Sequence, residues 1–339
     1  MIIDADAHVI ESDHTWDFLE SHERKYRPIA LTGSGGEKHW LVDGQLFSRE
    51  AGNQKLSIEV RQMADLKSRA AIMDESNIHT QVLYPTLFLQ GMPSKRPEIQ
   101  IALAGSYNRW LADIWKTNNR FRWAVIPPLL DIPSSIAELE FGKKNGACAV
   151  FMRGIEGEWL LHDPYLAPLY RKAEELDMPI CIHAGNGNNA FKDILFRKDL
   201  YFFGITPILA GFNAIASSGL QSQYKTLRFG FIEAGAQWVP YLVREADRRH
   251  HFIGTKGKVE NESTFLMDNR IWVTTRTNDD LPYVLKYAGQ GSLVLGTDFG
   301  HEDPAAEIDA FDRMRATPGI DSATIDAIFA TNARKLYAI

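Results

Sequence analysis

The sequence predicts a (β/α)8 TIM barrel, and two observations support this fold class. Short apolar segments typical of buried parallel strands alternate with segments of helical periodicity eight times along the 339 residues. Several of the strand-like segments also end in a polar residue, as expected where a barrel collects its site at the carboxyl ends of its strands. An open, doubly wound parallel sheet is the alternative arrangement of the same units.

The strands and helices follow one another in a regular order. The strand-like segments span 1–8, 79–85, 121–127, 147–153, 179–184, 228–234, 270–275 and 292–298. The segments with helical periodicity span 61–77, 97–118, 133–145, 163–177, 204–219, 236–252, 279–289 and 304–315. A helix between successive strands lets the strands pair in parallel, so eight such units favour a closed barrel.

Two segments interrupt this repeat, within what we expect to be a single domain over 1–339. Residues 12–60 form a predicted insertion after the first strand, and Asp43-Gly44 within 40–47 indicates a hairpin. We interpret the insertion as a lid or an oligomer contact. Residues 185–203 begin with glycines and asparagines and are expected to form a mobile loop over the site.

Composition excludes several classes of function. The chain is 45% hydrophobic and 24% charged, and its net charge of −6 (37 basic minus 43 acidic residues) offers no basic surface for nucleic acid. The sequence shows neither a signal peptide nor an apolar stretch long enough for a membrane helix, so a cytoplasmic protein without membrane contact is expected. Cys148 and Cys181 lie in apolar segments and are expected to be core residues.

Candidate metal ligands stand in the first, fifth and eighth strands. Asp6 and His8 are two residues apart on a strand and therefore point to the same side, while His183 and Asp298 each end an apolar strand. Imidazole and carboxylate ligands together suit Zn, Mn or Fe. Any one of these residues alone is more often a hydrogen-bonded core residue or a helix cap. Four at corresponding strand ends favour a metal site.

Candidate substrate-binding residues flank these ligands. Arg153 and Arg276 stand at strand ends and could bind a carboxylate through their guanidinium groups, or could instead pair with a neighbouring acid. Trp159 and Phe191 could form an apolar wall for the substrate, although aromatic residues in loops are as often hydrophobic plugs.

Four motifs together resemble the amidohydrolase superfamily. They are Asp4-Ala-Asp6-Ala-His8, the strand-five His183, Phe231-Ile-Glu233-Ala-Gly and Gly296-Thr-Asp298-Phe-Gly-His301. The similar branch contains aminocarboxymuconate-semialdehyde decarboxylase and γ-resorcylate decarboxylase, and is often called amidohydrolase family 2. This resemblance implies one divalent metal ion, Zn or Mn, held by Asp6, His8, His183 and Asp298. Asp6 replaces the usual His or Glu, which shifts the preference slightly toward Mn.

The sixth strand departs from the pattern of the family. The decarboxylases of this branch generally carry a histidine there that acts as acid or base, whereas this chain has Glu233. We interpret Glu233 as a base in the site, or as a hydrogen-bond partner of a metal-binding histidine. His301, three residues beyond Asp298, is a candidate proton donor, although a lone loop histidine is often solvated or caps a helix.

The resemblance implies an enzyme, and the reaction expected first is the non-oxidative decarboxylation of a small aromatic or unsaturated carboxylic acid. The alternative is a metal-dependent hydrolase of an amide, ester or lactone, in which Asp298 serves as general base for metal-activated water. A hydratase and a barrel that binds without turnover are further alternatives. The expected partners are a small-molecule substrate and a second copy of the chain, as a homodimer or a higher homo-oligomer.

Overall fold

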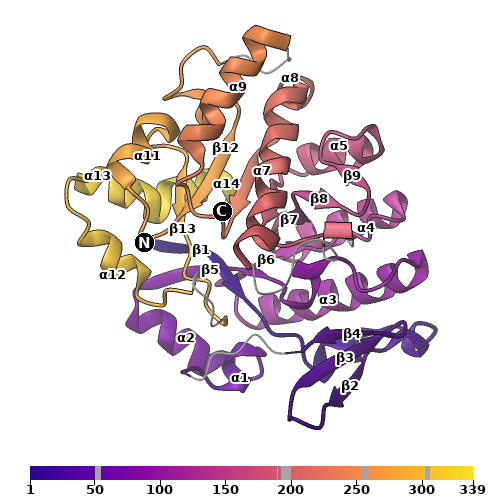
Figure 1. Cartoon of the computed structure of the whole chain (residues 1–339). Helices are drawn as coiled ribbons and strands as arrows, with labels where there is room; N and C mark the ends of the chain where they lie inside the picture. The colour runs from indigo at the N-terminus through magenta and orange to yellow at the C-terminus, as the bar shows by residue number, and fades with distance from the viewer. Residues whose placement is uncertain (50–54, 189, 192–199, 254–258, 302–305) are drawn as a thin grey trace.

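The computed structural model describes residues 1–339 except 50–54, 189, 192–199, 254–258 and 302–305. Its centre is an eight-stranded parallel sheet in the order β1-β5-β6-β7-β10-β11-β12-β13 (Figure 1). The strands are β1 (Ile2–His8), β5 (Ile78–Tyr84), β6 (Phe121–Val125), β7 (Ala147–Arg153), β10 (Ile180–His183), β11 (Phe229–Ile232), β12 (Ile271–Thr275) and β13 (Leu293–Leu295). A parallel bridge between Ala7 and Phe299 joins the two ends of the sheet. The (β/α)8 prediction is therefore confirmed, and all eight predicted strands are present.

Helices follow the strands as predicted. The longer ones are α2 (Leu66–Glu75), α3 (Pro97–Thr117), α4 (Ile132–Lys144), α5 (Ala167–Glu175), α7 (Leu200–Ser218), α9 (Val239–Ile253), α11 (Leu281–Ala288) and α12 (Ala310–Arg315). Aspartates cap the first turns of three of them, because Asp65, Asp131 and Asp280 accept hydrogen bonds from backbone N–H groups of α2, α4 and α11. Helix α12 is shorter than predicted.

The predicted mobile loop over 185–203 is only partly described. Helix α7 begins at Leu200 and so includes the end of this range, while residues 189 and 192–199 lie outside the described residues. Near the start of the range, Gly187 forms a parallel bridge to Glu156, which ties this segment to β8 (Ile155–Glu156), the short strand that follows β7.

The insertion after β1 contains the predicted hairpin. Strands β3 (Lys38–Val42) and β4 (Gln45–Ser48) are antiparallel, and Asp43 and Gly44 turn between them with φ of 48° and 75°. A strand that the sequence did not predict, β2 (Ile29–Thr32), completes a three-stranded sheet. Trp40 and Phe47 are buried on its inner face.

Short elements complete the fold. They are η1 (Asp13–Phe18), η2 (Arg24–Tyr26), α1 (Ile58–Arg61), η3 (Leu87–Gln90), β8 (Ile155–Glu156), β9 (Trp159–Leu160), η4 (Pro164–Leu166), α8 (Leu220–Gln223), α10 (Phe265–Asp268), α13 (Ser322–Asp326), η5 (Ala327–Thr331) and α14 (Asn332–Tyr337). Tyr337 of α14 donates a hydrogen bond to the carbonyl of Ala5 at 2.7 Å, and its hydroxyl lies 2.9 Å from that of Tyr84. The C-terminal helix is thereby fixed to β1 and β5.

The core follows the predicted pattern of apolar strands. Cys148 and Cys181 are both buried and free, as expected.

The helices of the described part of the chain were also compared with the requirements of a membrane span. None of them is both long and apolar enough to cross a membrane.

Candidate metal centre

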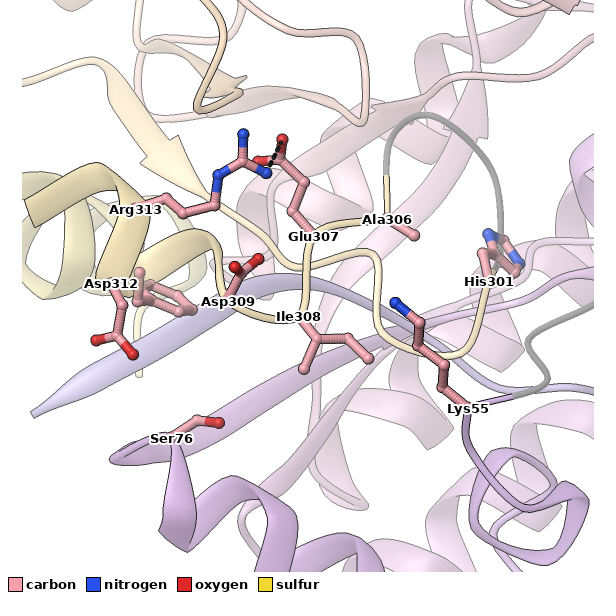
Figure 2. Close-up of a pocket in the computed structure, with 10 residues that line it drawn as sticks. Lys55, Ser76, His301, Ala306, Glu307, Ile308, Asp309, Asp312 and Arg313 are labelled. Atoms are coloured by element: carbon pink, nitrogen blue, oxygen red, sulfur yellow. Dashed lines mark hydrogen bonds and ion pairs between the residues drawn. The ribbon is translucent and has the colours of Figure 1, made fainter. Parts of the chain in front are cut away.

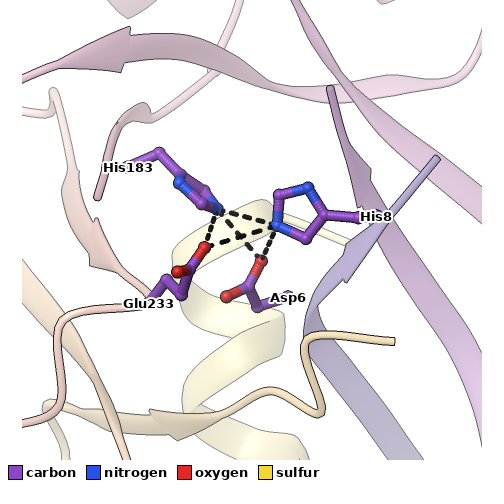
Figure 3. A group of neighbouring side chains, drawn as sticks. All are labelled: Asp6, His8, His183 and Glu233. Carbon is purple, nitrogen blue, oxygen red and sulfur yellow. Dashed lines mark hydrogen bonds and ion pairs between the residues drawn. The ribbon is translucent and has the colours of Figure 1, made fainter. Parts of the chain in front are cut away.

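Six polar side chains meet at the carboxyl ends of four barrel strands. Asp6 and His8 lie on β1, and His183 is the last residue of β10. Glu233 follows β11 directly, while Asp298 and His301 lie in the segment after β13. Figure 3 shows Asp6, His8, His183 and Glu233 converging on a common point. The sequence placed these residues at strand ends, and the structure brings them together.

The inward atoms of these side chains are very close to one another. The Nε2 atoms of His8 and His183 are 3.1 Å apart, and Asp6 Oδ1 lies 3.4 Å and 3.3 Å from them. Glu233 Oε2 lies 3.5 Å from His8 Nε2 and 3.3 Å from His183 Nε2 (Figure 3). Asp298 Oδ1 is 3.4 Å from His8 Nε2. Two sets of four potential ligand atoms, each within 4.8 Å of one another, share His8 and Glu233.

The outer nitrogens of the two histidines fix which ring atoms face the centre. His8 Nδ1 donates to the carbonyl of Pro85 at 3.0 Å, and His183 Nδ1 donates to the carbonyl of Ala184 at 2.8 Å. Because a neutral imidazole carries one proton, both Nε2 atoms then present lone pairs toward each other and toward carboxylate oxygens. Such a set of acceptors needs a cation at its centre, so the donor atoms fit a divalent metal ion.

The electrostatics of the metal-free cluster agree with this conclusion. Burial opposes the charged form of His8, but hydrogen bonds to Asp6 and Glu233 outweigh it and raise the pKa of His8 to about 10. Burial likewise opposes ionisation of Asp6, but the neighbouring His183 and His8 lower the pKa of this carboxyl. The carboxylates of Asp6 and Glu233 therefore favour positive charge at the two histidines.

Asp298 and His301 form a second pair beside this centre. His301 Nδ1 lies 2.9 Å from Asp298 Oδ1, and His301 Nε2 lies 2.9 Å from Thr86 Oγ1. The Thr86 hydroxyl donates to the carbonyl of Val9 at 2.8 Å, so its oxygen accepts from His301 Nε2. Burial and the neighbouring His8 and His183 hold the pKa of His301 well below its usual value, so the neutral ring carries its proton on Nε2 and turns Nδ1 toward Asp298. His301 Nδ1 and the Asp298 carboxylate are therefore close enough to exchange a proton beside His8.

The backbone at two of these acids is in an unusual conformation. Glu233 and Asp298 have φ of 63° and 50°, in the left-handed region that non-glycine residues rarely adopt. Arg276 Nη2 donates to the carbonyl of Glu233 at 2.8 Å and so helps to hold it there. Arg276 Nε is buried and has no hydrogen-bond partner among the described residues.

Arg153, the other predicted substrate-binding arginine, is occupied by an internal acid. It is 2% exposed, its Nε donates to Glu156 Oε2 at 3.1 Å, and its Nη2 donates to the same oxygen. Its Nη1 donates to the carbonyl of Phe88. Arg153 therefore pairs with a neighbouring acid, which was the second of the two predicted alternatives. Glu156 lies only three residues after Arg153 in the sequence, so the acid could have been identified there.

The two predicted aromatic residues lie in segments beyond the strand ends. Trp159 of β9 stacks on Tyr165, with ring centroids 4.3 Å apart and an interplanar angle of 12°. The backbone N–H of Phe191 donates to Asn188 Oδ1 at 3.2 Å. Neither contact involves a residue of the metal centre, and a role for Trp159 or Phe191 in substrate binding stays a prediction.

His301 also lines a cavity of about 550 Å³ (Figure 2). Charges of both signs surround it, from Lys55 and Arg313 on one hand and Glu307 and Asp309 on the other. Glu307 and Arg313 form an ion pair at 3.1 Å. Among its described lining residues, His301 alone belongs to the metal centre. The cavity therefore adjoins the His301–Asp298 pair rather than the converging ligand atoms.

The sequence missed three parts of this centre. It gave Glu233 a supporting position rather than a place among the converging atoms, and it did not identify Thr86 or Glu156 as partners. Glu233 offered a signal, because it ends an apolar strand just as His183 does. Thr86 offered none, because a threonine after a strand is common.

Comparisons with known proteins agree with this geometry. A family model described as amidohydrolase matches residues 3–339. No functionally curated protein matches the sequence. An amidohydrolase structure from Mycobacterium avium subsp. paratuberculosis K-10 is 18% identical with a TM-score of 0.81, covering 100% of this chain and 98% of its own.

Two decarboxylases of known structure are also similar. The 2,6-dihydroxybenzoate decarboxylase from Rhizobium is 22% identical with a TM-score of 0.63, over 81% of this chain and 88% of its own. The 5-carboxyvanillate decarboxylase from Novosphingobium aromaticivorans DSM 12444 is 17% identical with a TM-score of 0.74, over 100% and 96%. That enzyme was crystallised with manganese and 4-hydroxy-3-methoxy-5-nitrobenzoic acid. At these identities the likeness shows a shared fold.

Proposed function

The chain belongs to the amidohydrolase family of metal-dependent enzymes, and from this premise we propose that it is a non-oxidative decarboxylase of a small aromatic or unsaturated carboxylic acid. The observation that carries the proposal is the convergence of two histidine Nε2 atoms with the carboxylates of Asp6 and Glu233. The decarboxylases among the similar structures support the choice of reaction.

We propose that Asp6, His8, His183 and Asp298 hold the ion, as expected from the sequence, and that Glu233 joins them. Three carboxylates beside two imidazoles form a harder ligand set than typical zinc sites, which favours Mn over Zn. A bound divalent ion would draw electron density from the carboxylate and the adjacent oxygen of the substrate and stabilise the charge that develops during C–C cleavage.

The remaining chemistry falls to side chains of this chain. Decarboxylation replaces the carboxyl group by a proton, so a protonated group must lie beside the carbon that loses CO₂. We propose that His301 and Asp298 pass on this proton, because His301 Nδ1 lies 2.9 Å from Asp298 Oδ1, and the same oxygen lies 3.4 Å from His8 Nε2. Thr86 keeps the other nitrogen of His301 engaged, so that Nδ1 faces Asp298.

Arg276 is the better of the two predicted arginines for binding the substrate's acid group. Its Nε is buried without a partner among the described residues, whereas Arg153 already binds Glu156. We propose that Arg276 orients a polar group of the substrate while holding the Glu233 backbone.

A hydrolase of an amide, ester or lactone is the second candidate. The observation in its favour is that Asp298 lies within 3.4 Å of His8 Nε2 and could accept a proton from an attacking water. Isotopic labelling separates the two candidates, because a hydrolase incorporates solvent oxygen into a product and a decarboxylase incorporates solvent hydrogen at the carbon that loses CO₂.

The decisive experiment combines elemental analysis with an assay for CO₂. We expect about one Mn or Zn per chain in the purified protein, little in an Asp298→Asn variant, and CO₂ release from members of a hydroxybenzoate panel. Protein that neither contains nor takes up Mn or Zn would refute the metal site. Metal-loaded protein that cleaves amides or lactones but releases no CO₂ would favour the hydrolase. We further propose a homodimer or a higher homo-oligomer, which light scattering would test.

A further inference from the structure

Arg69 is a fully buried arginine on the outside of the barrel. It lies on α2 and is 0% exposed, an unusual environment for a guanidinium group. Its Nη1 donates to the carbonyl of His8 at 3.0 Å, and its Nε donates to Gln81 Oε1 at 2.9 Å. The guanidinium carbon also lies 4.5 Å from the ring centroid of Phe299. Arg69 thus touches both segments that meet where the barrel closes.

Gln81 extends this contact to the segment that carries Asp298. Gln81 Nε2 donates to Asp4 Oδ2 at 3.1 Å. Asp4 in turn accepts the backbone N–H of Thr297 at 2.9 Å and its hydroxyl at 2.6 Å. Thr297 directly precedes Asp298, so one buried chain of hydrogen bonds runs from the His8 carbonyl to the neighbour of Asp298. Its charged ends, Arg69 and Asp4, balance each other.

This chain lies where the backbone pairing is least regular. The β1–β5 ladder has a register shift between Asp4 and Ala7, and β13 is only three residues long. The two ends of the sheet meet through the Ala7–Phe299 bridge, with His8 N–H donating to Phe299 O at 2.7 Å. Asp298 N–H also donates to Asp6 O at 2.9 Å, so a few backbone hydrogen bonds join the two ends of the sheet, and the buried side-chain hydrogen bonds add a second link between them.

We propose that Arg69 is a positioning residue for the metal centre. Through Gln81 and Asp4, it links the backbone of His8 to the segment that carries Asp298. The inference rests on the proposed metal site. Removing a buried residue that orients a metal ligand without touching the ion typically weakens metal affinity by about ten- to a hundredfold. Arg69 would act on the ligands in this way while contacting only the backbone of one of them.

The test compares Arg69→Met with Arg120→Met in the full chain. Arg120 is a matched control, because it donates to the carbonyls of Ile78 and His79 at the opposite end of β5. Calorimetric titration of metal-stripped protein with Mn²⁺ should give an affinity about ten- to a hundredfold weaker for Arg69→Met than for the wild type. Arg120→Met should bind Mn²⁺ as the wild type does, even if it unfolds at a lower temperature.

Equal Mn²⁺ affinities in wild type and Arg69→Met would overturn the inference, as would an equal loss in both variants. If Arg69→Met does not fold, Gln81→Met interrupts the same chain without removing a charge and should weaken binding likewise. If the wild type binds neither Mn²⁺ nor Zn²⁺, the proposed function fails, and NMR of the protein without added metal still tests the positioning role. The imidazole signals of His8, identified by their loss in His8→Gln, should then shift in Arg69→Met and not in Arg120→Met; no shift in either would refute it.

Discussion

Replacing Glu233 by glutamine tests whether the acid after β11 is a ligand or a base. Its Oε2 lies 3.3 Å and 3.5 Å from the two inward histidine nitrogens, so an ion between them would be close to this carboxylate. Two unit charges about 4 Å apart interact by roughly 4 kcal/mol at an effective dielectric constant near 20, and a divalent ion doubles this. Because desolvation of the carboxylate offsets much of the gain, we expect a net loss of about 3 kcal/mol, or at least a hundredfold in Kd.

Titration calorimetry of metal-stripped protein with Mn²⁺ measures this loss directly. The matched control is Glu140→Gln, which removes the same charge from an exposed acid that pairs with Lys172. We expect the control to bind Mn²⁺ as the wild type does. A Glu233→Gln variant with wild-type Kd and a collapsed kcat would refute the ligand role and identify Glu233 as a proton-transfer group.

Four further outcomes follow from the same geometry. His183→Ala should abolish Mn²⁺ binding and turnover, and retained metal by elemental analysis would contradict its place among the ligands. Gly296→Ala should also weaken Mn²⁺ binding although it alters no ligand, because a Cβ there would lie 2.3 Å from the Cβ of Asp6; unchanged affinity in calorimetry would show that the backbone yields easily. Chelation should lower the Tm by several degrees and excess Mn²⁺ should restore it, since a ligand bound only to the folded state at a hundred times its Kd adds about 2.7 kcal/mol; a Tm insensitive to chelator would argue against a bound ion. Burial raises the pKa of Glu11 from 4.5 to about 7, so its contribution to stability is complete below pH 4.5 and is lost as the pH rises through 7. In denaturant titrations, Glu11→Gln should reduce the change in the free energy of unfolding over this pH range by about 3 kcal/mol. If the variant shows the same change as the wild type, another group causes the pH dependence.

The sequence predicted the barrel well because its signals are local. Apolar segments such as 147–153 coincide with β7, and the turn at Asp43-Gly44 depends only on neighbouring residues. The two-residue period of a strand likewise placed Asp6 and His8 on one side of β1. These features need no knowledge of which strands become neighbours across the closure.

Tertiary structure decided which polar residues meet. Glu233 reaches the two histidines because the curvature of the sheet and its left-handed backbone direct it inward, and neither is encoded by the pattern of apolar residues. Arg153 could have bound substrate or an acid, and only side-chain packing selected Glu156. Arg69 is buried beside Phe299, where the sheet closes, and the helical periodicity of 61–77 does not predict this burial. Local periodicity fixes the side of an element on which a residue lies, whereas distances between side chains depend on register, closure and rotamers that the whole chain sets together.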